Sequence, residues 1–107
     1  MSDLNLDDYP AGTAAVLAAL ADRRADNAHA AVPETQLAVD AGLDRETARQ
    51  AATALAEDGH LGRRVWTDGD EQVSGYYIDD LRVRRQGREL AAEQALASYS
   101  QSEDGTH

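Results

Sequence analysis

The basic side chains are the first residues of this chain that could do chemistry. All ten are arginine, and six of them fall within residues 61–88, which hold only five acids. Because the planar guanidinium fork can donate two hydrogen bonds to one phosphate, this segment is a candidate for phosphate binding. The candidates are Arg63, Arg64, Arg82, Arg84, Arg85 and Arg88. The alternative is that these arginines pair within the chain, with Asp79, Asp80 and the acids of residues 68–71.

A second group of polar side chains recurs at the outward positions of a predicted helix, between residues 45 and 53. Arginine can read guanine, glutamine can read adenine, and threonine can contact phosphate or a thymine methyl group. The outward positions hold Arg45, Glu46, Thr47, Arg49, Gln50 and Thr53, and all of these except Glu46 are DNA-binding candidates. Thr35 and Gln36, slightly earlier in the chain, could reach phosphate. A solvated helix face would carry the same residue types, so the pattern alone leaves both interpretations open.

Metal and enzyme chemistry find little support in the sequence. The three histidines, at positions 29, 60 and 107, show no ligand spacing, and cysteine is absent. The acids of residues 68–71 lack the remaining ligands and the glycine placement of a calcium loop. No glycine-rich phosphate loop or serine nucleophile motif occurs. We therefore expect a protein that is not an enzyme and that holds neither a metal nor another cofactor.

The overall charge is strongly negative, with 20 acids against ten bases and a net charge of −10. Abundant aspartate, no lysine and few large apolar residues resemble the proteins of extreme halophiles, with archaea as the expected source. At molar salt the Debye length falls to about 3 Å, so such a surface repels itself little. The alternative, a disordered acidic chain, conflicts with the periodic patterns described next.

Three helices are expected in the first half of the chain. Apolar residues at helical spacing predict a helix from Thr13 to about Asp26, and Val32 precedes a proline and should be extended. Pro33 is expected to open a second helix that ends at Gly42. Asp44 is a good N-cap for a third helix, over residues 45–58. The three-residue turn between the last two helices is typical of a helix-turn-helix.

The second half of the chain changes to an alternating pattern. Strands are expected at Leu61–Thr67 and Val73–Ile78, joined by an Asp-Gly-Asp turn. The alternation breaks at Asp79–Asp80 and resumes at Leu81 and Val83, which indicates a bulge or the end of the hairpin. A final helix is expected from about Gln86 to Tyr99. The fold class is therefore α+β and mainly α, with a two- to three-stranded hairpin followed by a C-terminal helix.

Three helices followed by a hairpin is the order of a winged helix-turn-helix. Residues 43–61 resemble the recognition-helix segment of MarR-like and related archaeal regulators, in their Leu-Asp turn, polar helix start, inward leucine and Gly-x-aliphatic exit. Residues 83–90 resemble the segment of that family where the second wing strand enters the last helix. Two features depart from the family: Arg84 replaces the usual threonine cap, and the wing tip, residues 68–71, is acidic where arginine is usual. The resemblance covers about residues 10–98.

This resemblance implies a sequence-specific DNA-binding transcriptional regulator that acts on double-stranded DNA. A homodimer is expected because the alanine-rich stripe of the last helix, with Val16, Leu17 and Leu20 of the first, is hard to cover within one small chain. It implies base contacts by residues 45–50 and further DNA contacts by Thr53, Arg63, Arg64, Arg84 and Arg85. The alternative is a winged helix used as a protein–protein interaction module, with the acidic surface facing a basic partner. The sequence identifies no small-molecule effector.

The expected organisation is an acidic arm at residues 1–9, a winged-helix domain with a C-terminal dimerisation helix at residues 10–98, and a disordered tail at residues 99–107. No apolar run approaches the roughly 18–20 residues of a membrane span, and the acidic N-terminus lacks a secretory signal, so a cytoplasmic location is expected. The leucines expected to be buried are Leu17, Leu20, Leu37, Leu43, Leu55, Leu61 and Leu90.

Overall fold

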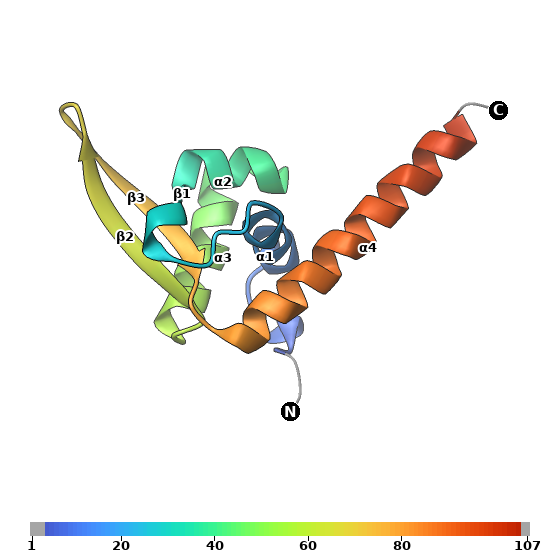
Figure 1. The fold of residues 1–107 in the computed structure, drawn as a ribbon, viewed down its shortest axis with the longest axis horizontal. Helices are drawn as coiled ribbons and strands as arrows, with labels where there is room; N and C mark the ends of the chain where they lie inside the picture. The colour runs from blue at the N-terminus through green and yellow to red at the C-terminus, as the bar shows by residue number, and fades with distance from the viewer. Residues whose placement is uncertain (1–3, 106–107) are drawn as a thin grey trace.

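The computed structural model describes residues 4–105 and has the predicted class of fold, mainly α with one small sheet (Figure 1). The helices are α1 (Thr13–Asp22), α2 (Glu34–Ala41), α3 (Arg45–Glu57) and α4 (Leu81–Gly105), with short 3-10 turns at Leu6–Asp8 and Ala28–Ala30. The strands are β1 (Val32–Pro33), β2 (Leu61–Asp68) and β3 (Glu71–Ile78). They form an antiparallel sheet in the order β1-β3-β2.

The helix-turn-helix of α2 and α3 forms where the sequence predicts it. Gly42 ends α2 with a φ of 69°, in the left-handed region that glycine adopts without a steric penalty. Asp44 caps α3, because its carboxylate accepts a hydrogen bond of 2.7 Å from the backbone N–H of Thr47. The inner face of α3 is fully buried and consists of Ala48, Ala51, Ala52 and Leu55.

The leucines expected in the core are mostly there. Five of them are buried, namely Leu17, Leu20, Leu37, Leu55 and Leu61. Leu43 and Leu90 are only partly buried and pack on the edge of the core. Leu43 lies in the turn between α2 and α3, where it closes over Gly12: a Cβ atom at Gly12 would lie 2.8 Å from its side chain.

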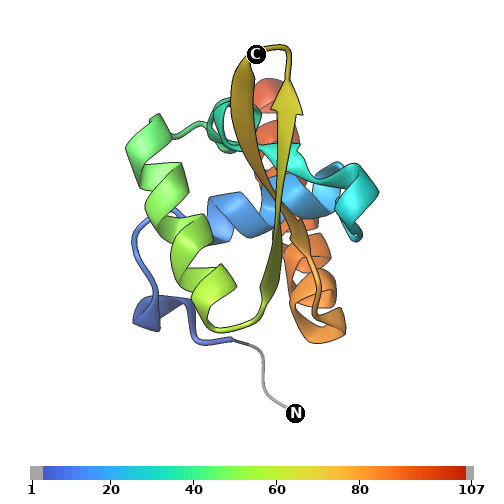
Figure 2. The ribbon, with the colours of Figure 1, turned by 90° about the vertical axis from the view of Figure 1, so that its left-hand side faces the viewer.

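The hairpin of β2 and β3 is the wing of the fold, and its two ends differ in burial. At the base Leu61 pairs with Ile78 and both are buried, whereas the exposed tip closes where Asp68 pairs with Glu71. Figure 2 shows the hairpin beside α3, with α1 lying across behind both. In Figure 1 the hairpin tip and the far half of α4 project from opposite sides of the helical body.

Of the two expectations for Asp79–Asp80, the end of the hairpin is confirmed, because β3 ends at Ile78, whereas a bulge with the alternation resuming at Leu81 is wrong. α4 begins at Leu81, because the Asp80 side chain accepts a 3.0 Å hydrogen bond from the Arg82 backbone and so caps a new helix. Val83 is buried, and so are Gln86 and Gly87 at helical spacing from it. Residues 83–90 therefore lie inside the helix rather than at its junction with the wing.

The first helix also differs from its prediction, since α1 ends at Asp22 rather than about Asp26. Arg24 takes a φ of 55°, which breaks the helical path and leads the chain towards β1. α1 and α4 then pack closely at Gly87, where a Cβ atom would lie 2.9 Å from the Leu17 carbonyl oxygen. A side chain at residue 87 would have to separate the two helices.

The N-terminal arm is tied to two distant elements. The Gln86 side chain exchanges two hydrogen bonds with the backbone of Leu4, at 2.9 and 3.0 Å. The Tyr9 hydroxyl donates a 2.6 Å hydrogen bond to Asp58 after the end of α3, and this bond raises the pKa of Tyr9 to about 12.

No helix in the described part of the chain is long and apolar enough to span a bilayer. The expected domain boundaries stay predictions, and residues 1–3, 106 and 107 lie outside the described residues.

Candidate nucleic-acid interface

The outer face of α3 carries most of the base-reading candidates. Arg45, Arg49, Gln50 and Thr53 are all exposed on it, opposite the buried alanine and leucine face. Thr47 differs from these four, because its side chain is half-buried and its backbone N–H is used by the Asp44 cap. The structure thus brings four of the five predicted side chains together on one solvent-facing helix surface.

Glu46 is an outward position of this helix to which its residue type alone assigned no role. Its two carboxylate oxygens accept hydrogen bonds from the Arg49 Nη2 atom at 2.6 and 2.8 Å, and one of them also accepts from Gln50 at 3.2 Å. The bond from Arg49 is the main reason that the pKa of Glu46 lies below its ordinary value. The same pairing raises the pKa of Arg49. The spacing of three and four residues along a helix was the signal that could have revealed this cluster.

The two wing arginines of β2 point to opposite faces of the hairpin, as neighbours in a strand must. Arg63 pairs with Tyr76 in the register and so lies on the face that carries the core, where its guanidinium donates to the Ser74 hydroxyl at 3.1 Å. Arg64 lies on the outer face, 5.4 Å from the centre of the Trp66 ring, and donates to the Ala28 carbonyl at 3.2 Å. Only Arg63 therefore shares the helix-facing side of the wing.

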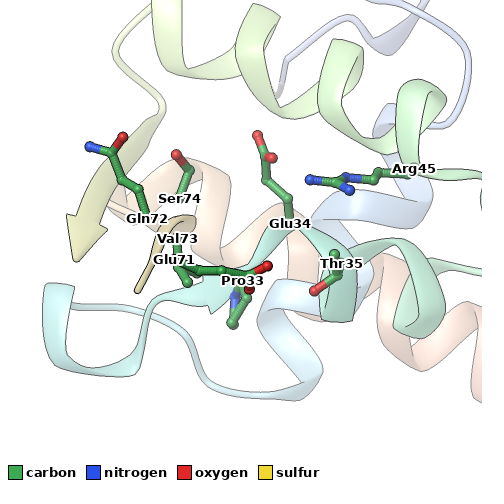
Figure 3. A pocket seen from close by; sticks show the side chains of 8 residues that line it. All are labelled: Pro33, Glu34, Thr35, Arg45, Glu71, Gln72, Val73 and Ser74. Atoms are coloured by element: carbon green, nitrogen blue, oxygen red, sulfur yellow. The ribbon is translucent and has the colours of Figure 1, made fainter. Parts of the chain in front are cut away.

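An open groove of about 300 Å³ lies between the start of α2, the start of α3 and the first half of β3 (Figure 3). In Figure 3 Glu34, Thr35 and Arg45 line its helical wall, and Gln72 and Ser74 line its strand wall. Glu34 is held there by a 3.3 Å hydrogen bond from the Tyr76 hydroxyl.

Of the two earlier phosphate candidates, only Thr35 reaches this groove. Gln36 donates to Asp40 at 2.9 Å instead, and the same carboxylate pairs with Arg23, the residue after α1.

The remaining predicted residues lie near the base of the wing, beyond the end of β3. Seven residue steps separate Glu71 from Ile78 along β3, which is about 23 Å at 3.3 Å per residue. Arg84 lies 3.8 Å from Asp26, and Arg85 lies 3.6 Å from Glu89. The structure therefore places Arg84 and Arg85 away from the groove, beside Asp26 and Glu89 rather than beside a residue of α3.

Pairing within the chain accounts for several of these arginines, with partners that differ in part from the expected ones. Arg82 lies 3.5 Å from Asp80, as expected, but the partners of Arg84 and Arg85 come from the loop after α1 and from α4. In residues 4–97 the tip acids Asp68, Asp70 and Glu71 take part in none of the ion pairs, and neither do Arg45 and Arg63.

Among the described residues, no three histidine, aspartate or glutamate side chains are grouped as metal ligands would be. The His60 ring instead contacts the Asp80 carboxylate at 3.1 Å, beside the edge of the Tyr9 ring. His107 lies outside the described residues.

No protein-family model matches the sequence, and no curated protein matches it. Solved structures do match. The zinc-responsive MarR-family member ZitR of Lactococcus lactis aligns with a TM-score of 0.64 at 17% identity, over 97% of this chain and 65% of that one. A point mutant of ZitR gives 0.63 at 15% identity, over 98% and 65% of the two chains. A MarR-family transcriptional regulator of Silicibacter pomeroyi gives 0.53 at 20% identity, over 83% and 68%.

These matches show the fold: the chain has the winged-helix architecture of these MarR-family regulators. The identities are too low to carry over individual residues. The chain spans about two thirds of the length of ZitR.

Proposed function

We propose that this protein is a sequence-specific DNA-binding transcriptional regulator that places α3 in the major groove of double-stranded DNA. The observation that carries the proposal is the exposed face of α3, which presents Arg45, Arg49, Gln50 and Thr53 from a rigid helix-turn-helix. A helix fits the major groove, and each of these side chains can reach a base edge or a phosphate from its first turns. The fold neighbours, which are transcriptional regulators, support the same assignment.

The rest of the interface follows from the helix-facing side of the wing and from the groove beside it. Arg63, on the helix-facing side of β2, is proposed to contact phosphate, with Thr35 and Arg45 doing so from the groove wall. Arg64 is proposed to hold the wing against the Ala28 carbonyl and to contribute charge from the outer face. The acidic tip should stay away from the DNA, because its carboxylates would meet phosphates of like charge.

A chain with a net charge of −10 must bind DNA against its own overall charge, and at molar salt the released counterions enter an already concentrated solution and add little driving force. We propose that it does so in the cytoplasm of a halophilic archaeon, where the surrounding salt is already concentrated. There the affinity rests on direct hydrogen bonds and shape, which salt weakens less than it weakens long-range attraction. Screening also removes most of the repulsion between the acidic surface and the DNA.

The proposed regulator is a homodimer that pairs through α4. The first part of α4 packs on α1, and Val16, Leu17 and Leu20 of α1 are buried within one chain, so α1 does not offer the apolar surface expected of it. Residues 92–97 of α4 are all exposed, and Leu96 is 68% exposed. A protruding helix with an exposed leucine and an alanine-rich face is suited to pack on a second copy of itself. Light scattering in molar potassium chloride should give twice the 11.5 kDa mass of the chain. A mass of one chain would contradict the dimer.

The test of the function is selection from a random duplex DNA library in molar potassium chloride, with the bound fraction sequenced. We expect a short motif in two copies, about one helical turn apart, as a symmetric dimer requires. The Arg49→Ala variant should select weakly or lose one position of the motif. If the folded protein enriches no duplex, DNA reading by α3 is wrong.

One observation favours a second candidate function, an interaction module for a basic protein. The groove carries Glu34 and Glu71, and the neighbouring tip carries Asp68 and Asp70, so a cationic side chain would find several carboxylates there. Under this alternative, neutralising Glu34 and Glu71 would abolish partner binding while Arg49→Ala would change nothing. The DNA library and these two variants therefore separate the functions.

A further inference from the structure

The side chains of Glu46 and Arg49 form a donor and an acceptor held side by side on the exposed face of α3. A single nitrogen of Arg49, Nη2, contacts both Glu46 oxygens at 2.6 and 2.8 Å. Both side chains remain more than half exposed, at 52% for Arg49 and 60% for Glu46. Surface pairs of this kind add little to stability, so stability gives little reason for placing a carboxylate in the middle of a DNA-reading surface.

The same alternation of donor and acceptor is the pattern that a G·C base pair presents in the major groove. Guanine offers the acceptors N7 and O6, and cytosine, next to them, offers the N4 amino donor. O6 and N4 are joined by a Watson–Crick hydrogen bond of the ordinary length, about 2.9 Å. The Arg49 nitrogen and the Glu46 oxygens are separated by nearly the same distance. The protein pair can therefore lie along the base pair with each polar atom opposite its complement.

A phosphate group lacks this pattern, because its exposed oxygens are all acceptors. Because Glu46 lies one helical turn from Arg49, its carboxylate is close to any phosphate that Arg49 contacts and meets it with like charge. On the edge of a G·C pair it accepts a hydrogen bond instead. The carboxylate thus opposes the unspecific contacts that a lone arginine makes readily.

We propose that Glu46 and Arg49 act as one reading unit for a G·C base pair, with Arg49 donating to guanine and Glu46 accepting from cytosine N4. Glu46 is then a specificity-determining residue of the interface, and Gln50, held by the same carboxylate, reads the neighbouring position. This inference rests on the proposed function, since it concerns how α3 selects among DNA sequences.

The experiment compares the wild-type protein with Glu46→Gln, on the duplex selected from the library, on the same duplex with the G·C pair changed to A·T, and on an unrelated duplex. We call the affinity for the selected duplex divided by that for the A·T duplex the G·C ratio. For the wild type this ratio should be about ten or more. For Glu46→Gln, this ratio should fall to a few-fold, while binding to the unrelated duplex becomes several-fold tighter. In an Arg49→Ala background, Glu46→Gln should leave the ratio unchanged, because the unit is already broken.

The matched control is Glu57→Gln, which removes the same charge from an exposed position near the end of α3, away from the pair. It should leave the G·C ratio at its wild-type value. Circular dichroism of each variant verifies that it is folded. A Glu46→Gln protein with an unchanged ratio, or with equally weakened binding to all three duplexes, overturns the inference while leaving the proposed function intact. A wild-type protein that enriches no sequence overturns both.

Discussion

The β2–β3 hairpin and the start of α4 beyond its base use arginine differently. At the start of α4, Arg82 and Arg84 lie beside Asp80, which caps this helix, and Asp26, which follows α1. Within the hairpin, Arg63 donates only to a serine hydroxyl among the described residues and faces the side of the helices. A charge count over residues 61–88 treats these arginines as one patch. The structure divides them into a set that braces the fold and a set that is available to a ligand.

Burial also differs between the base and the tip of the wing, and the same difference runs along α3. The C-terminal half of α3 leads into the base of the wing, where Leu55, Leu61 and Ile78 are buried. The N-terminal half of α3 borders the groove near the tip, where the wing residues are largely exposed. We therefore expect substitutions at the base to change stability and substitutions near the tip to change DNA binding.

The largest effect should come from Leu55→Ala at the base. Leu55 is fully buried, so its truncation removes apolar contacts and leaves a cavity. The free energy of unfolding should fall by about 2–5 kcal/mol, measured by urea denaturation. Val39→Ala, at a position that is 73% exposed on α2, is the control and should change it by less than about 0.5 kcal/mol. Equal losses in the two variants would contradict the packing of α3.

The next effect should come from Arg49→Ala on the outer face of the same helix. DNA affinity should fall by about 1–3 kcal/mol, with relaxed preference at one base pair. Stability should barely change, because the Arg49–Glu46 pair is exposed. Fluorescence anisotropy with a labelled duplex and urea denaturation of the same sample test both halves of the statement. A variant that unfolds more easily yet binds DNA normally would show that the outer face of α3 stabilises the fold and does not bind DNA.

The buried residues could be predicted from the sequence, but the residues proposed to bind DNA could be predicted only in part. Helical spacing of small and apolar residues located the inner face of α3, and Asp44 and Gly42 set its neighbouring boundaries, because capping and periodicity are local. Alternation failed at Leu81 and Val83, where two apolar residues two apart fit a strand as well as a helix. Asp80 caps a helix at this point, so α4 starts at Leu81, five residues before the expected start at about Gln86.

The partners of the arginines could not be predicted, because they depend on tertiary contacts. Asp26 lies beside Arg84 because the chain turns at Arg24, after the end of α1, and brings Asp26 close to the start of α4. Glu46 and Arg49, by contrast, are three residues apart in one helix, so their pairing was readable from the sequence. A charge count cannot distinguish these cases, since it assigns no direction to a side chain.

A smaller effect, of about 1 kcal/mol, should appear at the Asp80 cap as the pH is lowered. Burial by itself would raise the pKa of Asp80, but hydrogen bonds from His60 and from the backbone and side chain of Arg82 lower it below the ordinary value of 3.8. A carboxyl group whose pKa is depressed in the folded state stabilises the fold above the unfolded pKa, and this contribution is lost as the pH falls through the folded value.

Asp80→Asn removes this contribution. Its unfolding free energy should lie below that of the wild type at neutral pH, and the two curves should converge below about pH 4, as followed by urea denaturation between neutral and acid pH. Curves that stay parallel to the lowest pH would show that the Asp80 carboxylate does not stabilise the start of α4.

The smallest effect should separate the two sets of arginines through the salt dependence of DNA binding. Each phosphate contact contributes about 0.9 to the slope of log affinity against log salt. Arg63→Gln should lower that slope by about one and weaken binding to all sequences by a similar few-fold factor. Arg84→Gln should leave the slope unchanged, because Arg84 lies beside Asp26 beyond the far end of the wing. The measurement is a titration of one labelled duplex at several potassium chloride concentrations. A reduced slope for Arg84→Gln would place the base of the wing on the DNA, and the division between bracing and binding arginines would then be wrong.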